Sequence, residues 1–137
     1  MEQGNTAFVL FSAALVLLMT PGLAFFYGGL VKAKSVVSMM MLSFGSLALV
    51  AVLWVLYGYA IAFADVGDVG WFGIPHVIGI DTAALGLAAQ VADAAAPAGA
   101  IPELAFVAFQ ATFAIITVAL ISGAIADRAK FGAWMLF

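Results

Sequence analysis

The chain has 137 residues, of which 67% are hydrophobic and 8% are charged, and its formal net charge is −3. Soluble domains are roughly half apolar with about a quarter of their residues charged, so a water-soluble all-helical core is the weaker interpretation. The chain contains no cysteine, which excludes disulfides, thiolate nucleophiles and sulfur-ligated metal sites.

Three long stretches carry no charged side chain, namely residues 3–31, 35–64 and 104–126. A spanning helix needs about 20 apolar residues, and backbone in lipid must close its hydrogen bonds within the helix. We therefore predict an all-α membrane protein, with bilayer-spanning helices at about residues 7–31, 36–63 and 104–126. A fourth apolar stretch, residues 131–137, reaches only about 10 Å. We expect it to start a fourth span, in the N-terminal part of a longer protein.

The basic residues predict the orientation of these spans. Lys32 and Lys34 follow the first span, and Arg128 and Lys130 follow the third. Because cytoplasmic loops are enriched in Lys and Arg, both linkers are predicted to face the cytoplasm. The chain is then a multi-pass protein of the cell membrane with its N-terminus outside. The first stretch lacks a basic start and exceeds the roughly 7–15 apolar residues of a signal peptide, so we interpret it as a retained span.

The first span contains Pro21, which removes a backbone hydrogen bond and predicts a kink. The hydroxyl of Thr20 is one group that could compensate, although an incidental kink is an equally good interpretation. Small residues favour close contact between helices in bilayers. Four of them follow the proline: Gly22, Ala24, Gly28 and Gly29.

The second span ends in Trp54, Tyr57 and Tyr59, which favour a belt at the outer membrane interface over a ligand site. Glycine and proline recur in the connection of residues 65–103, where they break helices and mark turns. Within it, residues 82–91 predict a short surface helix after the N-cap Asp81. His76 is interpreted as a solvated surface residue, because no partner ligands for a metal lie nearby.

The third span carries an aromatic stripe. At 100° per residue, one arc of about 100° holds Phe106, Phe109, Gln110, Phe113 and Thr117. The other side holds Leu104, Ala108, Ile115, Val118 and Ala119.

An amide is costly against lipid, so Gln110 is expected to face protein or a water-lined passage. The rings beside it could attract a cation and block water, or they could simply pack a helix bundle; spacing alone favours packing. No nucleotide loop, acid/base pair or metal pattern occurs in the spans, so we predict no enzyme, cofactor, metal or nucleic-acid partner.

Several motifs resemble the ammonium transporter (Amt/Mep/Rh) family. The end of the first span, residues 20–31 (TPGLAFFYGGLV), is similar to the end of the family's first span. The second span resembles the family's second span at Ser38-Met39 and at residues 53–59 (LWVLYGY). Residues 109–117 (FQATFAIIT) and 119–124 (ALISGA) resemble its third span. The following turn, ADRAKF, has Asp127 where the family often has glutamate.

The resemblance implies an eleven-helix fold with a narrow hydrophobic pore in each protomer of a homotrimer. It implies ammonium or ammonia as the substrate and, in many relatives, a cytoplasmic PII protein as a regulator. Phe113 would be one ring of the outer gate, with Phe109 and Gln110 as its neighbours. The alternatives are a Rh-like channel for neutral gas and a membrane-inserted remnant that does not conduct.

Overall fold

The computed structural model describes residues 3–63, 80, 82–92 and 101–137. Every regular element among these residues is helical, which confirms the predicted all-α class. The elements are α1 (Gln3–Leu30), η1 (Ala33–Ser35), α2 (Val36–Leu53), η2 (Trp54–Gly58), α3 (Tyr59–Ala62), η4 (Thr82–Leu87), α4 (Ala88–Ala92), α5 (Glu103–Ser122), η5 (Gly123–Ile125) and α6 (Phe131–Leu136).

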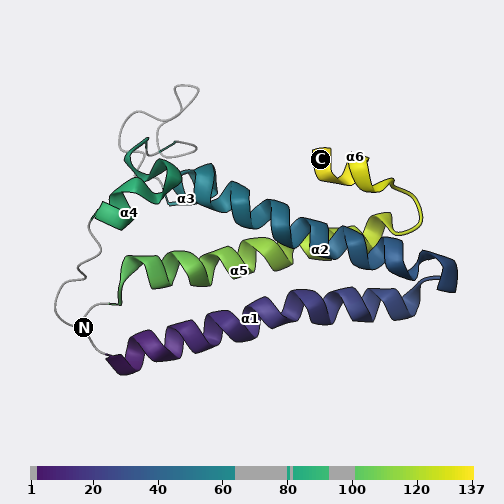
Figure 1. Cartoon of the computed structure of the whole chain (residues 1–137), viewed down its shortest axis with the longest axis horizontal. Helices are drawn as coiled ribbons and strands as arrows, with labels where there is room; N and C mark the ends of the chain where they lie inside the picture. The colour runs from purple at the N-terminus through teal and green to yellow at the C-terminus, as the bar shows by residue number, and fades with distance from the viewer. Residues whose placement is uncertain (1–2, 64–79, 81, 93–100) are drawn as a thin grey trace.

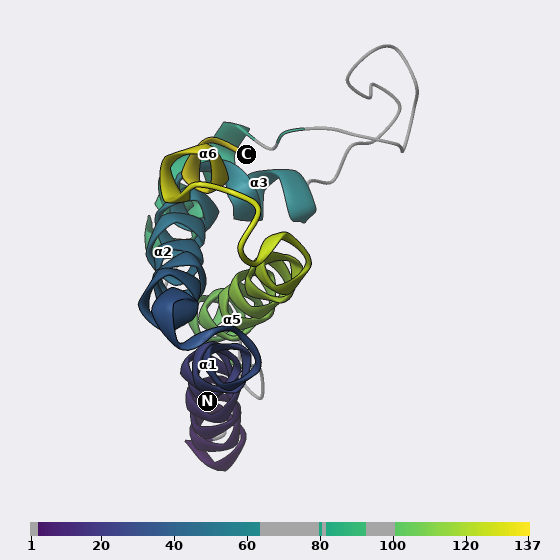
Figure 2. The same cartoon turned by 90° about the vertical axis from the view of Figure 1, so that its right-hand side faces the viewer.

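Three long helical segments are long and apolar enough to cross a membrane, and they cover Gln3–Leu30, Ala33–Ala62 and Glu103–Ile125. The helices α1, α2 and α5 contact one another pairwise. Figure 1 shows α1 and α5 running in one direction and α2 in the other, and Figure 2 shows the three from the end, with α6 on the side of α2. The three segments begin and end within four residues of the predicted spans.

The first helix continues through Pro21 without ending. The Thr20 hydroxyl is completely buried, yet it has no hydrogen-bond partner among the described residues, so it does not supply the expected compensation. Two of the four small residues make the predicted close contacts. Ala24 is fully buried, and Gly28 approaches side chains of α2, whereas a side-chain carbon at Gly22 would meet nothing.

The second span is continuous but irregular. The helix α2 passes into the π-helical turn η2 and then into α3. Trp54 Nε1 donates a hydrogen bond to the carbonyl oxygen of Val107 at 3.3 Å, and the hydroxyl of Tyr59 donates to Glu103 Oε1 at 2.8 Å. These two aromatic residues therefore join the second span to α5, while their place with Tyr57 in a belt at the outer interface stays a prediction.

The short helix predicted for residues 82–91 is interrupted. Leu85 has an extended ψ of 129°, and Gly86 has a φ of 63°, so the helical path is broken inside η4, before α4 begins. Glycine adopts this left-handed conformation without a steric penalty, and Leu87 follows it with a φ of 58°. Ala84 and Leu87 pack on Tyr59, Ala60 and Val107 at the ends of the long helices. Asp81 and His76 lie outside the described residues.

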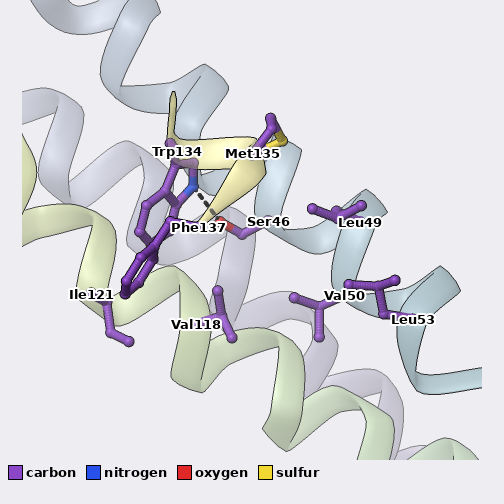
Figure 3. A pocket seen from close by; sticks show the side chains of 9 residues that line it. All are labelled: Ser46, Leu49, Val50, Leu53, Val118, Ile121, Trp134, Met135 and Phe137. Carbon is purple, nitrogen blue, oxygen red and sulfur yellow. Dashed lines mark hydrogen bonds between the residues drawn. The ribbon is translucent and has the colours of Figure 1, made fainter. Parts of the chain in front are cut away.

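The turn containing η1 and the turn between η5 and α6 lie at the same end of the bundle (Figure 1). These turns carry the four basic residues, and we call this end the basic end. The helix α6 folds back from it onto α2. The indole nitrogen of Trp134 donates to the Leu42 carbonyl oxygen at 3.1 Å. It also donates to Ser46 Oγ at 2.9 Å, the bond drawn in Figure 3.

Candidate functional site

An open groove of about 430 Å³ lies between the second span and α5. Its two polar aliphatic side chains are Gln110 and Thr117, and none of its lining residues is charged. The second span contributes Val50, Trp54, Ala62 and Phe63, and α5 contributes Gln110, Phe113, Ala114, Thr117 and Val118.

The helical repeat places part of the predicted stripe in this groove. Gln110, Phe113 and Thr117 are three and four residues apart and therefore share one side of α5. The other side of the helix is buried and includes Ala105, Thr112, Ile115, Ile116 and Ala119. The groove side of α5 therefore faces the second span, next to the contact that α2 makes with α5. Val118 was placed opposite the stripe by the 100° repeat, but it lines the groove.

The rings of Phe109 and Phe113 form an aromatic pair. Their centroids are 5.0 Å apart, and the ring planes meet at 77°, an edge-to-face arrangement. Thr112 Oγ1 donates to the Phe109 carbonyl oxygen at 2.6 Å, and Thr117 Oγ1 donates to the Phe113 carbonyl oxygen at 2.7 Å. Phe113 lines the groove with 41% of its surface exposed, whereas Phe109 contacts it without lining the groove.

The side-chain amide of Gln110 lines the groove next to the aromatic pair. No hydrogen bond of this amide is seen to the part of the chain that the structure describes. Its carbonyl oxygen can therefore accept a hydrogen bond from a ligand, while the face of the Phe113 ring can attract a positive charge. Together they suit a small cation that carries N–H donors.

The groove residues of the second span were not predicted. Trp54 was assigned to an interfacial belt, and Phe63 was not singled out. The structure connects both to the stripe, because the Phe63 ring lies 5.3 Å from Phe106 and 6.4 Å from Trp54. The sequence does carry a signal here, since Trp54, Tyr59 and Phe63 recur every four or five residues and so stay near one side of the span.

A second cavity, of about 200 Å³, lies between α2, α5 and α6 (Figure 3). Ser46 is its one hydroxyl-bearing residue and is already bonded to Trp134, so the space is apolar and offers no unpaired group to a ligand. Among the described residues no three His, Cys, Asp or Glu side chains gather where they could hold a metal ion.

Comparison with known proteins identifies the family. The sequence profile described as "Ammonium Transporter Family" matches residues 7–137. The chain belongs to the ammonium transporter family. It is 56% identical over 143 residues to an ammonium transporter of Mycobacterium tuberculosis (strain ATCC 25618 / H37Rv), an alignment that covers 99% of this chain and 30% of the relative.

An ammonium transporter of Bacillus subtilis (strain 168) is 47% identical over 141 residues, covering 100% of this chain and 32% of the relative. "Ammonium transporter Amt1" of Archaeoglobus fulgidus is 38% identical over 138 residues, an alignment that covers 99% of this chain and 30% of the relative. The chain thus spans about a third of the length of these relatives. Family membership confirms the resemblance of the motifs, while the roles of Phe109, Gln110 and Phe113 stay predictions.

Proposed function

We propose that this chain forms part of a transmembrane path for ammonium or ammonia, and that the path follows the groove of Gln110 and Phe113. The observation that carries the proposal is the pairing of an aromatic ring with an amide that has no partner among the described residues, both on the side of α5 that lines the groove. The names of the relatives, which are ammonium transporters, support the choice of substrate.

The chemistry of the groove suits selection followed by loss of charge. The ring face of Phe113 attracts a cation, and the Gln110 carbonyl oxygen accepts one of its N–H groups. Beyond them the lining is apolar and uncharged. A hydrated ion would lose its water ligands there, and no protein group would replace them. Burial disfavours the charged form, and ammonium would therefore pass a proton to water at the open side of the groove, so that neutral ammonia goes further.

Replacement of Phe113 by alanine tests this role. We expect Phe113→Ala to weaken the apparent affinity of methylammonium uptake by roughly 2- to 30-fold, the range of a cation–π contact. Phe44→Ala is a matched control, since Phe44 is similarly exposed (38%) and lies on α2 away from the groove. Uptake and selectivity that are unchanged in Phe113→Ala would overturn the proposal.

We further propose the finer features that the family resemblance implies. The protein is a homotrimer of the cell membrane with its N-terminus outside, and its basic end faces the cytoplasm, where a PII protein could dock. Because the chain has no cysteine, single cysteines can report the orientation. Lys34→Cys should react with an impermeant maleimide only after the cells are opened, and labelling of intact cells would reverse the orientation.

A further inference from the structure

Three side chains from three separate elements meet at the end of the bundle opposite the basic end. Glu103 is the first residue of α5, Tyr59 begins α3, and Gln90 lies in α4. The hydroxyl of Tyr59 donates to Glu103 Oε1 at 2.8 Å, and Gln90 Nε2 donates to the same oxygen at 3.2 Å. Both donors use Oε1, and no described residue donates to Oε2.

The amide oxygen of Gln90 lacks a donor. Gln90 is buried, with 8% of its surface exposed, and its Oε1 atom has no hydrogen-bond partner among the described residues. Turning the amide over would place its oxygen against the carboxylate, so the orientation is fixed by Glu103. A buried acceptor without a partner costs free energy, which a donating ligand would recover.

The negative charge of Glu103 also lacks a nearby basic partner in the described structure. The four basic residues lie at the basic end, and the helical segment Glu103–Ile125 separates the two ends by about 35 Å. That distance is several times the Debye length of roughly 8–10 Å, so these charges do not neutralise the carboxylate. Glu103 itself is exposed, and an ion from solvent can reach it.

We propose that Glu103, Gln90 and Tyr59 form a binding site for ammonium, separate from the Phe113 site. An ammonium ion has four N–H donors, and the exposed carboxylate would take the first at Glu103 Oε2. Gln90 Oε1 is enclosed, so the amide, which already contacts the carboxylate through Nε2, would have to shift to accept a second N–H. Calcium, by comparison, takes about 6–8 oxygen ligands, which these side chains do not supply. The choice of ammonium rests on the proposed function.

The site adjoins the groove through Phe63. The Tyr59 ring is 5.0 Å from the Phe63 ring, and Phe63 lines the groove that holds Phe113. Ten residues of α5 separate Glu103 from Phe113, a rise of about 15 Å. Ammonium held at Glu103 would therefore be stored close to the aromatic pair, and its local concentration there would be raised.

Ligand-induced stabilisation tests the site without any need for transport. The protein expressed from its own gene is purified in detergent, and its thermal unfolding is followed as ammonium chloride replaces N-methylglucamine chloride at constant ionic strength. We expect a saturable rise in the unfolding temperature. The variants are made in a Phe113→Ala background, which removes the ring of the other proposed ammonium site. There, Glu103→Gln should abolish the rise, and Gln90→Met should shift its midpoint roughly tenfold to higher ammonium.

Gln3→Leu is the matched control, because Gln3 lies at the start of α1 and outside the site. Its titration should match that of Phe113→Ala alone. The ammonium site would be overturned if Glu103→Gln and Gln90→Met responded to ammonium as strongly as the chain that keeps both residues. It would also be overturned if potassium chloride raised the unfolding temperature as much as ammonium chloride does. The absence of any saturable response in a protein that takes up methylammonium would also overturn it and leave the proposed function standing. A saturable response in a protein that does not take up methylammonium would support the site and overturn the proposed function.

Discussion

At the basic end, glycine and serine let the helices approach closely, whereas at the opposite end aromatic rings join them. A side-chain carbon at Gly123 would lie 2.6 Å from the Tyr27 ring, and Ser43 and Ser122 meet in the interior at 3.4 Å. At the other end, which we call the aromatic end, the contacts are between the rings of Trp54, Tyr59, Phe63 and Phe106.

The two ends also differ in how completely their polar groups are paired. Toward the basic end, the indole of Trp134 and the hydroxyls of Ser46 and Ser122 are hydrogen-bonded, and the buried hydroxyl of Thr20 is the exception. Toward the aromatic end, the amide groups of Gln90 and Gln110 keep acceptors without a described partner. Unpaired polar groups lower stability and are retained where a ligand uses them, so the comparison separates a structural end from a candidate binding end.

The largest effect is expected from Gly123→Ala. The added carbon overlaps the Tyr27 ring, which cannot swing away freely because its hydroxyl donates to the Leu120 carbonyl oxygen at 3.2 Å. We expect the free energy of unfolding to fall by about 1–3 kcal/mol, measured by denaturation in detergent. The control Gly22→Ala adds a carbon that meets nothing and should raise stability by about 0.5–1 kcal/mol. Equal changes in both variants would show that the basic end is not tightly packed.

A smaller difference is expected between two tryptophans. Trp134→Phe removes an indole that donates at 2.9 and 3.1 Å to two buried acceptors, and it should cost about 1–2 kcal/mol of unfolding free energy. Trp54→Phe removes one longer bond of 3.3 Å at the aromatic end and should cost about half as much. Thermal unfolding of the two variants side by side measures the difference. A greater loss of unfolding free energy in Trp54→Phe than in Trp134→Phe would mean that the aromatic end, and not the basic end, is the structural end.

The positions of the spans could be predicted because charge and length determine them almost alone. The three charge-free stretches became three helices, since lipid leaves the backbone no other way to pair its groups. Contacts between helices could not be predicted to the same degree. Gly22 and Gly28 look alike in the sequence, but Gly28 is the one that contacts α2, because the helical phase turns Gly22 away.

The candidate site was predicted in part. The 3.6-residue repeat correctly placed Gln110 and Phe113 together, because both belong to one helix. The opposite wall, with Trp54 and Phe63, depends on how the second span lies on α5 and on the π-helical turn at Trp54–Gly58. Such turns are rare, occur inside α-helices and have no hydrophobic pattern of their own. The pairing of Glu103 with Gln90 likewise joins residues that no local spacing relates.

Gln110→Leu is expected to change stability least among these variants, while it lowers methylammonium uptake. No described partner loses a hydrogen bond, so the free energy of unfolding should stay within about 0.5 kcal/mol of the original or rise. Methylammonium uptake should fall, because the groove loses its amide acceptor and keeps an apolar wall of similar size. Uptake and unfolding are measured on the same membrane preparations. A loss of more than about 2 kcal/mol would instead mean that Gln110 bonds across a helix interface and that the aromatic stripe serves packing.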